Sequence, residues 1–385
     1  NSVVRGIEKY DHVFYELNSS LHVYGRSDRF SSINPALFLR SEVSQLRRST
    51  LGLVRLVVDG PCAFSKIPEQ KRRRENSKHL FRPNITPGSV FMDDFELEFP
   101  EVLTEFNNVN YLSSNTLGEG EQKIFQEINN KRLENSLVIT NDSDTYLYTL
   151  SCQHEVDVLI IDRESKYTLI KENLKNIYLK NICEDVDRMC ADLCFLTLLI
   201  GSDYLKSRVP FDISSIWDTY LNLKNTSTFK ESYITNKESV KINLDMLDQV
   251  FIVLLKNTSY VSELSTNKEH AKKYFDSLMW NFGLLKQSSS EVDYRYKVFD
   301  LQTSEINISS MIRALEKEPS PTFNATPPLS PHAHAVAVIP QYQNYLLHSQ
   351  YHPIAEEYHR NMYADPANWY NNVLMMEQQI NKLSK

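Results

Sequence analysis

The chain has 385 residues, of which 41% are hydrophobic and 24% are charged, and its formal net charge is −7. This is the composition of a soluble globular protein with room for two subdomains, and the acidic balance argues against a surface coated in nucleic acid. No apolar run reaches the roughly 18 residues of a membrane-spanning helix, and no secretory signal opens the chain, which starts at Asn1 as a fragment or processed product would. Five cysteines without a CxxC pair fit a reducing compartment, so we expect an intracellular protein, cytoplasmic rather than nuclear.

Short apolar runs alternate with helical patterns along the first half of the chain. One helix is predicted to open at 118–121, and another, strongly apolar, covers 189–200. Strands are predicted over 12–16, 51–58, 109–112, 136–140 and 156–161. Because strands and helices alternate, the pattern predicts an α/β fold with a mostly parallel central sheet and helices on both faces.

The pattern of polar and apolar residues changes near residue 225. We therefore divide the chain into two parts, 1–225 and 226–385. The second part begins with a polar, loop-like stretch and then shows helical patterns over 244–255 and 271–285. Five prolines fall within 318–331, which predicts an irregular tether. We therefore expect a helical, loop-rich C-terminal subdomain.

Carboxylates recur at the ends of the apolar runs. Glu16, Asp59 and Asp142 follow predicted strands, and ligands of α/β sheets bind outside the carboxyl ends of the strands. We expect these acids to meet and to hold Mg²⁺, which prefers oxygen ligands. The full candidate set of metal ligands is Glu16, Asp59, Glu119, Glu121, Asp142, Asp144 and Asp203.

Each of these acids also has a simpler interpretation. The Asp142-x-Asp144 pair suits a helix N-cap, and Glu119 suits the positive end of a helix dipole. Asp203 is different, because it follows a buried helix whose end should favour a cation, so it needs a partner and a metal is a natural one.

A basic cluster follows the second predicted strand. Lys66, Gln70, Arg73 and Arg74 share one helical face at i, i+4, i+7 and i+8, a spacing that places four donors around one phosphate. The alternative is an exposed basic helix, since a charge run is usually a solvated face. His22, six residues after Glu16, would as a lone histidine more often be structural.

Taken together, these segments closely resemble the motifs of XRN-type 5′→3′ exoribonucleases, which belong to the PIN-like/flap-endonuclease superfamily. Six ordered motifs carry the resemblance: YELNSSLH (15–22), VDG with the basic helix (58–74), ITPG with FM (85–92), GEGEQKI (118–124), NDSD (141–144) and LIGSDYL (199–205). Weaker likeness continues around 278–280 and 328–340, so the resemblance covers roughly 11–225 and 270–370. The chain resembles a divergent, minimal homologue of that family.

The resemblance implies an XRN N-terminal-type nuclease domain over 1–225, with 226–385 as a second conserved region that completes the active-site pocket. It implies Mg²⁺-dependent (or Mn²⁺-dependent) exoribonuclease activity that hydrolyses 5′-monophosphorylated single-stranded RNA stepwise with two metals, in RNA degradation such as mRNA decay. Lys66, Gln70, Arg73 and Arg74 would bind the 5′-phosphate, and His22 would stack on the first base, with Tyr294 or Tyr296 as its partner. The catalytic residues implied are Asp59, Glu119, Glu121, Asp142, Asp144 and Asp203.

Two departures from the family pattern bear on activity. Glu16 stands where the family has Asp, which lengthens one metal ligand by a methylene, and the family's SWxWYY stretch is not intact. Two other functions therefore stay open from the sequence: a structure-specific 5′ nuclease that acts on DNA flaps, and a catalytically weak RNA-binding homologue.

Overall fold

The structure is a computed structural model of the whole chain. It describes residues 7–26, 34–77, 81–161, 166–170, 172–173, 175–176, 185–206, 209–236, 241–256, 267–286, 291–299, 307–315 and 321–383.

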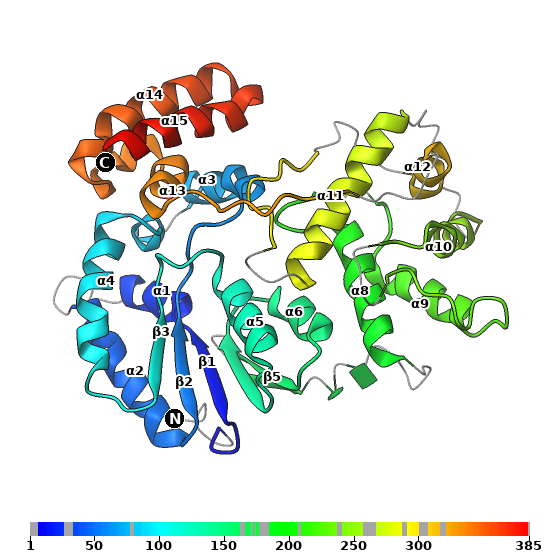
Figure 1. Cartoon of the computed structure of the whole chain (residues 1–385), viewed down its shortest axis with the longest axis horizontal. Helices are drawn as coiled ribbons and strands as arrows, with labels where there is room; N and C mark the ends of the chain where they lie inside the picture. The colour runs from blue at the N-terminus through cyan, green and yellow to red at the C-terminus, as the bar shows by residue number, and fades with distance from the viewer. Residues whose placement is uncertain are drawn as a thin grey trace.

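A six-stranded sheet with the order β3-β2-β1-β4-β5-β6 forms the centre of the fold (Figure 1). The strands are β1 (His12–Glu16), β2 (Leu53–Val57), β3 (Val109–Leu112), β4 (Ser136–Thr140), β5 (Val156–Ile161) and β6 (Lys166–Ile170). The first five pair in parallel, and β6 pairs antiparallel with β5. The predicted mostly parallel α/β sheet is confirmed. The β6 edge strand was not predicted.

Both faces of the sheet are covered by helices, which explains why central strands such as β4 are buried on both sides. Successive residues of β1 point to opposite sides, and both Val13 and Phe14 are fully buried. Val13 packs in a core with residues of α1 (Asn18–Arg26), α2 (Pro35–Ser49) and α4 (Val90–Leu103). Phe14 packs in another with residues of α5 (Gly120–Lys131), α6 (Thr145–Ser151) and α8 (Val186–Ile200).

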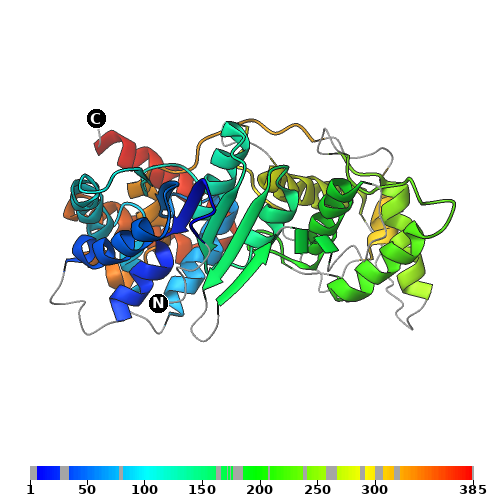
Figure 2. The same cartoon turned by 90° about the horizontal axis from the view of Figure 1, so that it is seen from below.

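A helical lobe extends from α8 at one side of the sheet (Figures 1 and 2). It contains α9 (Ile213–Lys224), α10 (Leu244–Lys256), α11 (Lys268–Lys286) and α12 (Ile308–Ala314). The helices predicted over 189–200, 244–255 and 271–285 are thus present with slightly wider bounds. These helices continue the hydrophobic core of α5, α6 and α8, so the lobe is joined to the sheet by a common apolar interior.

The chain then returns to the sheet domain through an irregular segment, 321–330, that runs from the lobe towards α3 (Ile67–Glu75) (Figure 1). Of the predicted tether 318–331, residues 318–320 lie outside the described residues, and the last one, Pro331, already belongs to a helix. The tether ends at Ser330 because its hydroxyl caps the helix, accepting from the Ala333 N–H at 3.4 Å, and proline suits a first helical turn.

The C-terminal helices cover the basic segment next to the sheet. They are α13 (Pro331–Val338), η3 (Gln341–Leu346), η4 (Ser349–Tyr351), α14 (His352–Ala364), η5 (Pro366–Asn368) and α15 (Trp369–Leu383). Ala335 and Val336 of α13 are buried in one cluster with Phe64 of η1 (Phe64–Lys66) and Ile67 of α3. A short helix, η2 (Arg82–Ile85), precedes α4. Among the described residues, no helix is long and apolar enough to cross a membrane.

Candidate metal and phosphate site

Three acids lie together where neighbouring parallel strands end. Glu16 is the last residue of β1, Asp59 follows β2, and Asp142 follows β4. The Gly120 N–H donates to Asp59 Oδ1 at 2.7 Å, and Thr140 Oγ1 donates to Glu16 Oε2 at 2.5 Å. A Cβ at Gly120 would lie only 3.1 Å from Glu16 Cγ and 3.2 Å from Asp59 Oδ1, so glycine is what lets α5 approach both acids.

Glu119 and Glu121 approach the same place from the start of α5. Glu119 is the N-cap of that helix, as the simpler interpretation expected, and both side chains are buried. The Tyr204 hydroxyl donates to Glu119 Oε2 at 3.0 Å. Burial raises the pKa of Glu121 well above its usual range, and the charges of Asp142 and Glu119 raise it further. The two glutamates therefore contribute more than a helix cap.

The Asp142-x-Asp144 pair starts α6. Asp142 Oδ1 accepts from the Asp144 N–H at 2.8 Å, so part of the local-turn interpretation is observed. Asp144 occupies the N-cap position without a side-chain cap bond. Burial, and then the neighbouring charge of Asp142, raise the pKa of Asp144 to about 6. This second carboxylate is thus held close to the first.

Asp203 reaches the cluster from the end of α8. Gly201 ends that helix with φ 121°, a conformation that favours glycine. Asp203 Oδ2 lies 2.8 Å from Lys66 Nζ, and Arg73 donates to Oδ1. Although burial acts to raise it, these two cations hold the pKa of Asp203 below its usual range. The partner that the sequence required for Asp203 is therefore a pair of cations.

The gathering of acids places negative charge at high density in a poorly solvated site. The pKa of Glu16 rises to about 8, through burial and then through the charge of Asp59. The pKa of Asp59 rises to about 6, through burial and then through the charge of Glu119. Burial also raises the pKa of Asp142. Each of the seven predicted acids interacts electrostatically with at least one other, so the structure gathers them into one region. Among the described residues, however, no three of these acids bring ligand atoms within 4.8 Å of one another.

The basic residues predicted to share a helical face do so on η1 and α3. Lys66 Nζ lies 2.6 Å from Glu119 Oε1, and although burial acts to lower it, Glu119 and other nearby acids hold the pKa of Lys66 well above its usual range. Gln70 Nε2 donates to the same oxygen at 3.4 Å. Arg74 donates to Thr86 Oγ1 at 2.9 Å and to Gln70 Oε1 at 3.1 Å. These contacts hold the side chains of Lys66, Gln70 and Arg74 in place next to the acids.

The acids and the bases line one cavity of ≈ 370 Å³. Of the predicted residues, the cavity is lined by Glu16, His22, Asp59, Lys66, Gln70, Arg73, Arg74, Glu119 and Asp142. Glu121, Asp144 and Asp203 are not lining residues, although they interact with those that are. One cavity is thus lined by both kinds of group. We call Glu16, Asp59, Glu119 and Asp142 its acidic wall, and Lys66, Gln70, Arg73 and Arg74 its basic wall.

Three further lining residues were not singled out from the sequence. Asn18 donates to Asp59 Oδ2 at 2.6 Å and accepts from the Asp59 N–H at 2.9 Å, which orients that carboxylate. Arg82 lines the cavity from η2, and its place in the basic run was a signal. His334 lines it from α13, where no local pattern marks it, because only the packing of α13 on α3 brings it there.

The aromatic pair suggested as partners of His22 lies elsewhere. Tyr294 is buried, and its carbonyl accepts from the Phe64 N–H at 2.8 Å. Tyr296 stacks on Trp280 with ring centroids 5.3 Å apart. Neither tyrosine lines the cavity that His22 lines. Their rings instead fill the small apolar cluster between α11 and η1.

No protein-family model matches this sequence, and no curated protein matches it either. Solved structures with a similar fold include the catalytic core of Rad2 in complex with DNA substrate, at 16% identity over 81% of this chain and 90% of that one, with a TM-score of 0.42. Human GEN1 in complex with Holliday junction DNA is 13% identical over 80% and 67%, with a TM-score of 0.39. The T5 D15 protein co-crystallized with metal ions is 9% identical over 62% and 83%, with a TM-score of 0.35. At such low similarity, any role for the site rests on this chain's own geometry.

Proposed function

We propose that this protein is a divalent-metal-dependent nuclease, specifically a 5′→3′ exoribonuclease that removes nucleotides stepwise from 5′-monophosphorylated single-stranded RNA. One observation carries the proposal: a single cavity is lined both by the carboxylates Glu16, Asp59, Glu119 and Asp142 and by the donors Lys66, Gln70, Arg73 and Arg74. Metal-assisted phosphodiester hydrolysis uses both, because the metal ligands must lie next to the groups that hold the phosphate.

The acids fit a site for Mg²⁺ or Mn²⁺. Their oxygens are the ligands that these hard cations prefer. Burial first, and then neighbouring carboxylates, raise the pKa values of Glu16, Asp59 and Asp144, and a divalent cation would favour the charged form of all three. Bound there, such ions supply a nucleophilic water and stabilise the leaving oxygen. The residues proposed to hold them are Glu16, Asp59, Glu119, Glu121, Asp142, Asp144 and Asp203.

The basic wall is proposed to bind the terminal phosphate. Arg74 is already oriented by Thr86 and Gln70, so its guanidinium is fixed before a ligand enters. Lys66 and Arg73 contact Asp203, and they would exchange that carboxylate for phosphate oxygens. Charge-assisted bonds from a fixed guanidinium are strong and directional, which suits recognition of a doubly charged chain end.

His22 is proposed to stack on the first base. It projects from α1, the helix that directly follows β1, and it lines the same cavity as Glu16. Base stacking on a ring is tolerant of sequence, and the phosphate contacts carry no sequence information either. The proposed enzyme therefore selects the RNA end rather than a base sequence.

The test is a comparison of initial rates on one labelled RNA with a 5′-monophosphate, a 5′-triphosphate or a 5′-hydroxyl, and on a matched DNA flap. Reactions contain Mg²⁺, Mn²⁺ or a chelator, and Asp142→Ala serves as the control. We expect rapid stepwise digestion of the 5′-monophosphate RNA alone, dependent on metal. Faster cleavage of the flap would favour a DNA nuclease, and RNA binding without cleavage would favour a binding protein.

A further inference from the structure

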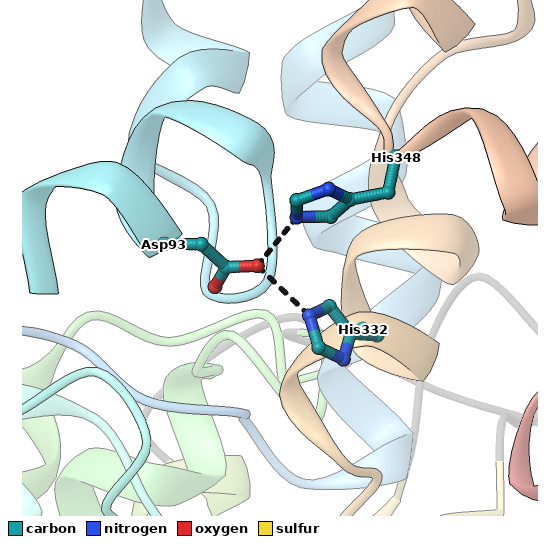
Figure 3. Close-up of side chains that lie close together, drawn as sticks. All are labelled: Asp93, His332 and His348. Carbon is teal, nitrogen blue, oxygen red and sulfur yellow. Dashed lines mark hydrogen bonds and ion pairs between the residues drawn. The ribbon is translucent and has the colours of Figure 1, made fainter. Parts of the chain in front are cut away.

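A second cluster of metal-ligating side chains lies outside the cavity. Asp93 Oδ2 is 2.8 Å from His332 Nε2 and 2.7 Å from His348 Nε2 (Figure 3). The three ligand atoms all lie within 4.8 Å of one another, and each side chain is partly exposed. None of the three lines the cavity of the proposed nuclease site.

The three ligands come from segments that are distant in sequence. Asp93 lies in the first turn of α4, whereas His332 lies in the first turn of α13 and His348 precedes η4. The backbone approach is close, because a Cβ at Gly88 would meet the Pro331 carbonyl at 2.2 Å. Gly88 has φ 81°, so both its conformation and its surroundings require glycine. This junction joins the C-terminal helices to the sheet domain.

The two imidazole rings are oriented in a way that suits binding to one common ion. Both imidazoles direct Nε2 at the same oxygen of Asp93, although that carboxylate has two oxygens (Figure 3). Tyr351 is buried beside them, with ring centroids 5.2 Å from His332 and 6.4 Å from His348. The tyrosine therefore limits how far either ring can rotate, which is the role that supporting residues play around metal ligands.

We propose that Asp93, His332 and His348 form a binding site for a transition-metal ion of the Zn²⁺ class. Two imidazoles and one carboxylate suit Zn²⁺, and they leave one coordination position for water. Tetrahedral coordination places ligand atoms about 3.4 Å apart, given Zn–N and Zn–O bonds of about 2.0–2.2 Å. The two nitrogens would thus retreat from the carboxylate by roughly half an ångström, and protons on Nε2 would leave as the ion binds.

The ion would act as a cross-link between α4 and the C-terminal helices. α13 also packs on α3, and it carries His334 into the lining of the cavity. Metal bound at Asp93 would therefore hold the segment that supports the basic wall, without touching the acids. Its main effect is expected on the stability of the folded chain, and it does not depend on the proposed nuclease activity.

The experiment compares Zn²⁺ binding by four forms of the full chain after chelator treatment: the parent, His348→Gln, Asp142→Ala and His352→Gln. His352 is the matched control, because it lies in the same segment and its Nε2 contacts the Leu347 carbonyl. Elemental analysis gives the stoichiometry, titration gives the affinity, and Co²⁺ in place of Zn²⁺ reports imidazole ligands by its visible absorption. Thermal unfolding with and without Zn²⁺ gives a readout that is independent of activity.

We expect the parent, Asp142→Ala and His352→Gln to retain the imidazole-bound ion and to unfold at a higher temperature with Zn²⁺. His348→Gln should lose one equivalent, or bind it at least 10- to 100-fold more weakly, since even outer partners of a metal site contribute that much. If His348→Gln does not fold, His332→Gln repeats the measurement. Equal Zn²⁺ stoichiometry and Co²⁺ spectra in the parent and the folded histidine variant would overturn the proposal, leaving a hydrogen-bonded Asp–His cluster.

Discussion

The two walls of the cavity differ in where their residues come from in the sequence and in how their charges are compensated. The acidic wall gathers side chains from strand ends and a helix start between Glu16 and Asp142, and burial raises the pKa values of Glu16, Asp59 and Asp142, as it does those of Glu121 and Asp144 beside them. The basic wall comes mainly from one short segment, Lys66 to Arg74, whose cations have acidic or hydroxyl partners. The acidic wall therefore resists ionisation, and the nearby cation Lys66 offsets this effect only in part.

Ion pairs join the two walls. Lys66 lies between Glu119 and Asp203, and its side chain and that of Glu119 are both buried. Because a buried charge left without a partner is costly, these pairs should persist until metal and phosphate take their places. The comparison teaches that the acidic wall should determine catalysis and metal binding, whereas the basic wall should determine which chain end is accepted.

The largest effect should follow from changing the acidic wall. Asp142→Ala removes a proposed metal ligand, and we expect cleavage of 5′-monophosphate RNA in Mg²⁺ to fall roughly 100- to 1000-fold, because metal ions supply several kcal/mol of transition-state stabilisation. Initial rates measure this, and circular dichroism checks the fold. Glu101→Ala, on an exposed part of α4, is the control. Parent-like cleavage by Asp142→Ala would contradict the metal-site assignment.

A smaller and more selective effect should follow on the basic wall. Arg74→Ala should reduce the preference for 5′-monophosphate over 5′-hydroxyl RNA by about 10- to 100-fold, because a charge-assisted bond contributes about 1.5–3 kcal/mol and each 1.4 kcal/mol is tenfold. Arg72→Ala is a matched control, since Arg72 is exposed, pairs with Glu69 and does not line the cavity. Rates on both RNAs are measured at two salt concentrations. Equal losses on both ends would indicate a generic basic face instead.

Glu16→Asp should lower the cleavage rate moderately, by roughly tenfold or less. The shorter side chain draws the carboxylate away from Thr140 Oγ1, which now donates to it, and from Gly120, which approaches its Cγ. A cleavage rate equal to that of the parent would show that the backbone shifts to make up for the missing methylene group. Paired measurements of cleavage rate and Mg²⁺ dependence distinguish weaker metal binding from slower chemistry. Faster cleavage than the parent would show that the surroundings have not adapted to glutamate.

The smallest expected effect is a change in the stability of the folded protein with pH. Glu16 has a folded pKa of about 8, raised from its ordinary value of 4.5, so the folded state holds a proton that the unfolded chain releases. Its contribution is therefore fully present below the unfolded pKa and is lost as pH rises through about 8. Without metal, the unfolding temperature should drop by a few degrees between about pH 5 and pH 8 because of this linkage. Mg²⁺ or Glu16→Gln should reduce that drop, and an unchanged drop in both would argue against the charge cluster as its cause.

The sequence by itself determined five strands of the sheet, several of the helices and the candidate acids. Apolar runs ending in Glu16, Asp59 and Asp142 predicted strands whose carboxyl ends meet, and the structure places them at one edge of a parallel sheet. The helical spacing from Lys66 to Arg74 likewise predicted that the basic residues lie on one face of a helix. Local patterns suffice here, because each apolar run and the helical spacing lie within one element, and the carboxyl ends of parallel strands meet at the same edge of a sheet.

Only the tertiary structure decided how the charges are paired. The contacts of Lys66 and Arg73 with Asp203 depend on how α8 ends next to α3. The meeting of Asp93 with His332 and His348 spans 239 and 255 residues. No periodic pattern encodes such contacts, because they form only when elements that are distant in the sequence pack together and bring polar side chains next to one another.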